Sequence, residues 1–144
     1  MLHSIGKWSF NTPSGFVELP APTNVSAQCV SALRTGAAMA SVPTTMYVDY
    51  FAPPNPPEPT TAFDFRQRLA AFLLVRGEYS FFGHGWITDK PVVWYPEWDW
   101  EVGVPLTNMT RSGNIFSRSW SKGDVSLDCD NFVASFTFKT KAAD

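Results

Sequence analysis

Acidic and aromatic residues alternate in one short stretch of the chain, Tyr-Pro-Glu-Trp-Asp-Trp-Glu at positions 95–101. Tryptophan and tyrosine rings stack on the flat C–H faces of sugar rings, and carboxylates accept hydrogen bonds from sugar hydroxyls. The stretch therefore predicts a carbohydrate-binding loop rather than a buried core. The residues that we expect to contact substrate are His84, Trp86, Trp94, Tyr95, Glu97, Trp98 and Trp100.

Hydrolysis of a glycosidic bond needs two carboxyl groups, separated by roughly 5 to 9 Å. Asp49, at the end of an expected strand, and Asp99, in the aromatic loop, are the pair that we predict as catalytic acid and base. Glu78, Glu97 and Glu101 are further candidates, but Glu78 begins its expected strand at the end away from the loop, which favours a structural role.

Two other hypotheses remain open beside the enzyme. A single acid in such a stretch is more often a solvated surface carboxylate, so the chain can equally be a noncatalytic carbohydrate-binding or structural module with packed aromatics. A degenerate remnant without a ligand would instead bury Trp94, Trp98 and Trp100.

Metal and cofactor sites are not expected. His84 lies between two glycines, as a neutral ring bonded beneath the loop or as a ligand contact, and His3 is the only other histidine. The sequence has no phosphate-binding loop, dinucleotide glycine pattern or nucleophile elbow. Cys29 and Cys129 show no metal or redox spacing, and we favour two packed thiols over a disulfide.

Charge and hydropathy exclude two classes of partner. The net charge is -2 over 144 residues without a Lys/Arg cluster, so nucleic acid is not expected, and the longest apolar run, 69–75, is too short to span a membrane. No signal peptide is visible, but the sequences Asn24-Val25-Ser26 and Asn108-Met109-Thr110 have the form of glycosylation acceptors. The compartment stays open, with secretion as one option.

Hydrophobic periodicity predicts a mixed α/β chain. A proline-rich connection and a helix separate two expected strands, which is the pattern of a βαβ unit, and three alternating runs follow as an antiparallel meander. The expected strands are 15–19, 42–50, 78–86, 115–120, 124–129 and 132–139, and the expected helices are 26–39 and 61–77.

Three blocks in this order, "RLAAFLLVRGEYSFFGHGW", "YPEWDWEVGVPL" and "GNIFSRSWSKGDVSLDCDNFVASF", resemble the C-terminal part of a family of hypothetical, barrel-type glycosyl hydrolases. The resemblance implies the last few β/α units of a TIM-barrel-like fold at 1–112, followed by a C-terminal antiparallel β-meander at 113–144. Val104 and Ser119 stand where the family pattern has glutamates, and Asn108 or a neighbour stands where a cysteine would pair with Cys129.

A full barrel needs about 250 residues, so 144 residues supply only part of one. The unpaired strands of such a part predict either self-association or a missing N-terminal barrel half as partner. Carbohydrate is the expected ligand.

Overall fold

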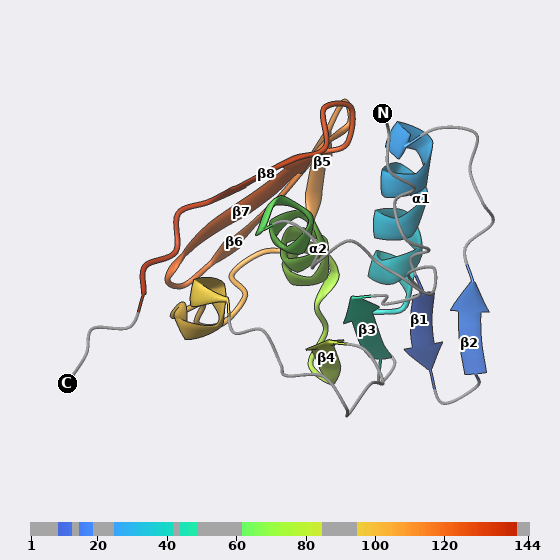
Figure 1. Ribbon diagram of the computed structural model, residues 1–144, viewed down its shortest axis with the longest axis horizontal. Coiled ribbons are helices and arrows are strands. Elements are labelled where there is room, and N and C mark those ends of the chain that lie inside the picture. The colour runs from blue at the N-terminus through green and yellow to red at the C-terminus, as the bar shows by residue number, and fades with distance from the viewer. Residues whose placement is uncertain are drawn as a thin grey trace.

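The computed structural model describes residues 9–12, 15–18, 25–41, 44–48, 62–84 and 95–140. Within them the chain forms two α-helices, one 3-10 helix and eight strands (Figure 1). In chain order these are β1 (Ser9–Thr12), β2 (Gly15–Glu18), α1 (Val25–Ala38), β3 (Thr44–Val48), α2 (Ala62–Val75), β4 (Ser80–His84), η1 (Pro96–Asp99), β5 (Thr110–Ser112), β6 (Ile115–Trp120), β7 (Gly123–Asp128) and β8 (Val133–Phe136).

The first sheet has the strand order β2-β1-β3-β4. β1 pairs antiparallel with both β2 and β3, and β3 pairs in parallel with β4, with Val48 opposite His84 at the carboxyl ends. The strand–helix–strand unit predicted from the sequence is thus present as β3, α2 and β4.

The second sheet is an antiparallel meander in the order β5-β6-β7-β8. The three runs predicted at the C-terminus form β6, β7 and β8, and β5, which the sequence did not predict, adds a fourth strand. Period-two alternation places Phe116 and Trp120 of β6, and Val125 and Leu127 of β7, on one buried face. That face packs on α2.

Helix α2 lies between the two sheets (Figure 1). It contacts α1, β3, β6, β7 and β8, and it is buried on nearly every side. A helix surrounded in this way needs an apolar surface all round, which explains the run of alanines, leucines and phenylalanines in its sequence. Its buried residues are Phe65, Gln67, Leu69, Ala70, Ala71, Phe72, Leu73, Leu74 and Val75.

The predicted TIM-barrel-like β/α units are wrong. The described residues contain two α-helices and one parallel strand pair, and the other strand pairs in both sheets are antiparallel. A barrel helix packs on one sheet and turns its other side to solvent. The meander instead covers the outer side of α2, so the β3–α2–β4 unit becomes the centre of a small, mostly β fold.

Arg118 of β6 holds the C-terminal end of α2. Its Nη1 donates to the carbonyl oxygens of Arg76 at 2.7 Å and of Leu73 and Leu74 at 3.3 Å, and its Nε donates to Thr107 O at 2.9 Å. Burial, and to a smaller extent the nearby Arg76, lower the pKa of the Arg118 guanidinium. The side chain satisfies carbonyls that the end of a helix leaves without partners.

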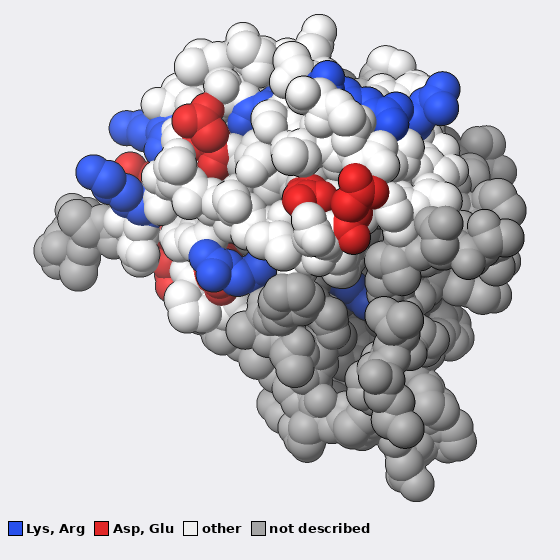
Figure 2. All heavy atoms as spheres, turned by 90° about the horizontal axis from the view of Figure 1, so that it is seen from above, with Lys and Arg blue, Asp and Glu red and all other residues white. Residues whose placement is uncertain are grey.

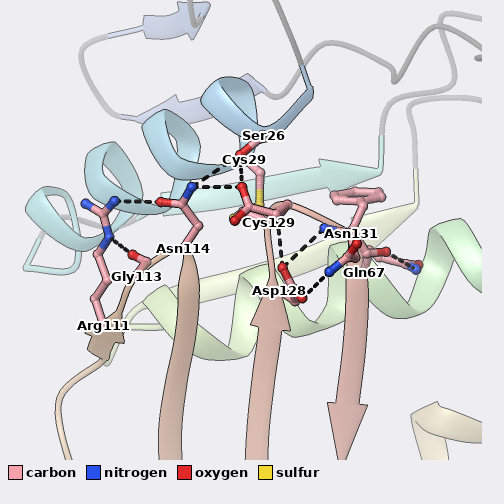
Figure 3. The surroundings of a disulfide bond; sticks show 11 residues. Ser26, Cys29, Gln67, Arg111, Gly113, Asn114, Asp128, Cys129 and Asn131 are labelled. Carbon is pink, nitrogen blue, oxygen red and sulfur yellow. Dashed lines mark hydrogen bonds between the residues drawn. A yellow bond between two sulfur atoms is a disulfide. The ribbon is translucent and has the colours of Figure 1, made fainter.

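A disulfide joins α1 to the end of β7, between Cys29 and Cys129, which are 1% and 0% exposed (Figure 3). The interpretation as two packed thiols is therefore wrong. Spacing could not show this pairing, because the two cysteines lie 100 residues apart and meet only through the tertiary fold.

Polar side chains surround this junction. Asp130 Oδ1 accepts hydrogen bonds from Ser26 Oγ at 2.6 Å and Asn114 Nδ2 at 2.8 Å, which ties the first turn of α1 to two turns of the meander. Asp128 accepts from the backbone of Asp130 and from both nitrogens of Asn131 (Figure 3). Hydrogen bonds from Asn131 lower the pKa of Asp128, and those from Ser26 and Asn114 lower the pKa of Asp130.

These two lowered pKa values predict an acid-sensitive junction. A carboxylate whose pKa is lowered in the folded state stabilises the fold above its unfolded pKa, and this contribution is lost as the pH falls below about 4. We expect the free energy of unfolding to decrease over that range, and the decrease to be smaller in Asp130→Asn. Denaturant titrations between pH 6 and pH 2 measure it, and an identical acid profile in the variant would contradict the assignment.

The face seen in Figure 2 carries mixed charge. Figure 2 shows Lys and Arg side chains interspersed with Asp and Glu around a broad uncharged area. Among the described residues, no helix is both long enough and apolar enough to cross a membrane.

Candidate functional site

The aromatic stretch of the sequence forms a short 3-10 turn, η1, packed beside α2. Pro96 occupies the first helical position, where its missing N–H costs nothing, and Trp98 N donates to Tyr95 O at 3.0 Å. Beyond the turn, Glu101 N donates to Lys139 O at 3.1 Å, so the stretch is fixed to the strand-like end of the meander.

Tyr95 anchors the stretch to α2. Its ring stacks on Phe65, with centroids 3.9 Å apart and planes 6° apart, and the residue is only 6% exposed. One face of the ring is covered, so Tyr95 offers little surface to a ligand.

Trp98 and Trp100 are half-buried. The Trp98 ring lies 5.3 Å from Phe65 and 5.5 Å from Phe82 of β4, between centroids. The Trp100 ring lies 5.0 Å from that of Phe136 of β8. Each indole is therefore held on one side by rings from elements distant in sequence and retains partial exposure.

Arg66 of α2 connects these groups. Its guanidinium carbon lies 5.6 Å from the Trp100 ring centroid and 5.5 Å from that of Phe136, while its Nε lies 3.1 Å from Glu97 Oε1. The Glu97 side chain is 11% exposed. Its carboxylate is thus oriented by the arginine.

The remaining acids of the stretch face solvent. Asp99, predicted as catalytic, and Glu101 are both exposed, and Lys122 Nζ lies 4.0 Å from Glu101 Oε2. Gly103 follows in a left-handed conformation, φ 76°, and a Cβ there would lie 2.0 Å from Ser121 Oγ. Glycine is required at this turn because it avoids both the strain and the collision.

One further predicted site residue lies at the carboxyl end of β4. His84 is the last residue of β4 and is paired in register with Val48, and Asp49 follows Val48 in the chain. Asp49, Trp86 and Trp94 lie outside the described residues. Trp98 contacts Phe82, which lies two residues before His84 in β4. The aromatic stretch therefore lies close to the carboxyl end of β4.

The structure thus brings Tyr95, Glu97, Trp98 and Trp100 together on α2 and leaves Asp99 on their solvent side. Sequence analysis missed the partners that hold them: Phe65, Arg66, Phe82 and Phe136. The described residues contain no group of three or more His, Cys, Asp or Glu side chains arranged to hold a metal ion.

Comparison with protein families matches the region that contains this site. Residues 58–124 match the model of hypothetical glycosyl hydrolase family 15. The match confirms the resemblance seen in the sequence, and it extends from before α2 through η1 to the start of β7. No curated protein matches the chain.

Proposed function

We propose that the chain binds carbohydrate on the solvent side of residues 95–101, as a polypeptide related to glycosyl hydrolases. The observation that carries this proposal is that Trp98 and Trp100 are each held by core rings on one side yet remain partly exposed, with the exposed Asp99 between them. The family match over residues 58–124 supports the same ligand class.

Fixed rings favour sugar binding for an energetic reason. A side chain that is ordered before the ligand arrives loses less conformational entropy on binding, so more of the stacking energy appears as affinity. The contacts of Trp98 with Phe65 and Phe82, and of Trp100 with Phe136 and Arg66, supply this order.

The proposed chemistry is glycoside hydrolysis, with Asp49 and Asp99 as the acid and base. The parallel register of β3 and β4, which puts Val48 beside His84, and the contact between Trp98 and Phe82 support a common site at this end of the sheet. One carboxyl group would protonate the glycosidic oxygen while the other acts as a base on water or as a nucleophile.

A noncatalytic module is the second candidate, and a specific observation favours it. Tyr95 is buried against Phe65, and part of the surface of Trp98 and of Trp100 is covered by contacts with other protein rings. In that case the aromatic stretch would serve to fasten η1 to α2, and carbohydrate binding, if retained, would proceed without hydrolysis.

Binding is tested by tryptophan fluorescence titrated with a panel of soluble oligosaccharides. We expect a saturable change for at least one sugar, and a loss of affinity of about tenfold or more in Trp98→Ala, equivalent to ~1.4 kcal/mol. Trp98→Phe keeps a ring against Phe65 and Phe82 and serves as the control for folding. If no sugar changes the fluorescence while Trp98→Ala unfolds the chain, the aromatics are structural and the proposal fails.

Hydrolysis is tested separately, by release of reducing ends from any sugar that binds. Asp49→Asn and Asp99→Asn are each expected to lower the rate by at least about a hundredfold while binding is kept. Glu78 is an exposed acid that precedes the N-terminal end of β4, away from the proposed site. Glu78→Gln should therefore leave the rate of hydrolysis unchanged. Rates in Asp49→Asn and Asp99→Asn equal to that of Glu78→Gln would contradict the assignment of the acid and base. No release of reducing ends by the unaltered chain would leave binding without catalysis, as the second candidate requires.

A further inference from the structure

We propose that Asn108 is a site of N-linked glycosylation. The residues Asn108-Met109-Thr110 form an acceptor sequence, and Asn108 is exposed in the segment between the bridge at Pro105 and the start of β5. Its side chain has no hydrogen bond or ion pair among the described residues. An oligosaccharide on this amide would therefore displace no contact of the fold.

The backbone on either side of Asn108 is fixed. Leu106 N donates to Ser119 O at 2.9 Å, and Thr107 Oγ1 accepts from Ser119 N at 3.1 Å. After it, Met109 is half-buried against the core and Thr110 Oγ1 donates to Ser117 O at 3.2 Å. The acceptor amide thus lies on a supported surface segment, where an attached sugar points to solvent.

The apolar surface next to Asn108 is a second argument for an attached oligosaccharide. Val104 and Leu106 are each 64% exposed, and both precede Asn108 in the same segment. Exposed apolar side chains of this size favour association between molecules. A bulky, hydrated oligosaccharide on Asn108 would cover these two side chains.

The disulfide agrees with folding in an oxidising compartment, such as the endoplasmic reticulum. Disulfides form and persist in the endoplasmic reticulum and in secreted proteins, and rarely in the cytosol. Both cysteines of this chain are paired with each other. A chain that folds in the endoplasmic reticulum meets the oligosaccharyltransferase there, so the disulfide and the acceptor sequence agree.

The reaction transfers an oligosaccharide from a lipid diphosphate donor. The Asn108 side-chain nitrogen forms a bond to the anomeric carbon of the first sugar, and the bond from that carbon to the diphosphate oxygen breaks. The lipid diphosphate leaves with the electron pair, and the amide nitrogen gives up one proton to a base of the transferase. The chain supplies only the acceptor.

The test sends the whole chain through the secretory pathway of a eukaryotic host behind an added signal peptide. We analyse two pools, the secreted molecules and the molecules retained in the cell, and in each pool only those with a cleaved signal peptide. Their intact mass is measured before and after treatment with peptide N-glycosidase. We expect an oligosaccharide mass that the enzyme removes, leaving aspartate at position 108 in the peptide map.

Matched variants locate the site. Asn108→Gln and Thr110→Ala should abolish the modification at position 108, whereas Thr110→Ser, which keeps the hydroxyl, should retain it. Asn24→Gln removes the other acceptor sequence and should leave position 108 modified. Disulfide-bonded wild-type chain with an unmodified Asn108 in both pools, or a mass shift confined to Asn24, overturns the proposal.

Discussion

Removal of the Cys29–Cys129 disulfide is expected to lower the free energy of unfolding by about 4 kcal/mol. The bond closes a loop of 100 residues, and a crosslink over that length restricts the unfolded chain more than a short one. It is also the covalent link between α1 and the meander, which are joined in addition by hydrogen bonds among Ser26, Asn114 and Asp130. The variant Cys29→Ala/Cys129→Ala, compared with wild type by urea titration, gives the measurement.

The burial of the disulfide predicts its behaviour towards reductants as well. Since the cysteines are 1% and 0% exposed, a mild reductant should not reach the bond in the folded chain, and reduction should follow unfolding. Thiol counting in buffer and in denaturant separates the two cases. A decrease in stability below about 1 kcal/mol in the double variant, or rapid reduction without denaturant, would show that the bond does not hold the fold together.

Arg118→Met is expected to cost about 2 kcal/mol of folding free energy. The substitution keeps an unbranched side chain against Trp120, whose ring centroid lies 5.1 Å from the guanidinium, but removes donors from the carbonyls of Arg76, Leu73 and Leu74. Partial exposure of Arg118 allows water to replace some of these bonds, which keeps the expected cost below that of a fully buried charge.

Arg111→Met is the matched control for this substitution. Arg111 also belongs to the meander, and its guanidinium carbon lies 5.2 Å from the ring centroid of Phe116. It is exposed, however, and within the described part of the chain its side chain bonds to Gly113 and Asn114 of its own turn. Its replacement should cost less than about 1 kcal/mol. Equal costs for the two arginines in thermal or urea unfolding would contradict the capping role of Arg118.

Local patterns predicted most individual elements well. The helix expected at 61–77 is α2 at Ala62–Val75, and the strand expected at 42–50 contains β3 at Thr44–Val48. These segments have strong periodicity or clear stop signals, such as Gly77, whose added Cβ would lie 1.8 Å from Ala40 O. The strand β1 was not predicted because three of the four residues in Ser9–Thr12 are polar and the segment has little alternation.

The arrangement of the elements could not be predicted in the same way. A buried helix and a barrel helix both contain leucine and alanine, and only the meander packed on the outer side of α2 distinguishes them here. The resemblance to a barrel-type family supplied the wrong architecture for the described residues, although residues 58–124 do match a family of hypothetical glycosyl hydrolases.

Half of the candidate site was visible in the sequence and half was not. The types of Tyr95, Glu97, Trp98 and Trp100 suggested sugar contacts, but an aromatic residue has the same identity in a core and on a rim. Their depth is decided by Phe65, Phe82 and Phe136, which come from three other elements. Arg66 gave no signal, because its pairing with Glu97 and Trp100 exists only in three dimensions.

The most direct test of the central claim is a nitrogen–proton correlation spectrum recorded during a titration with sugar. The titrant is a soluble oligosaccharide that changes the tryptophan fluorescence or, if none does, each member of the sugar panel. Sugar bound on the solvent side of residues 95–101 should shift the indole N–H signals of Trp98 and Trp100 and the backbone amides around Asp99. The indole of Trp120, which is buried in the meander, should not move. Unchanged Trp98 and Trp100 signals at sugar concentrations up to the solubility limit, or shifts confined to the meander, would contradict the claim that this stretch binds carbohydrate.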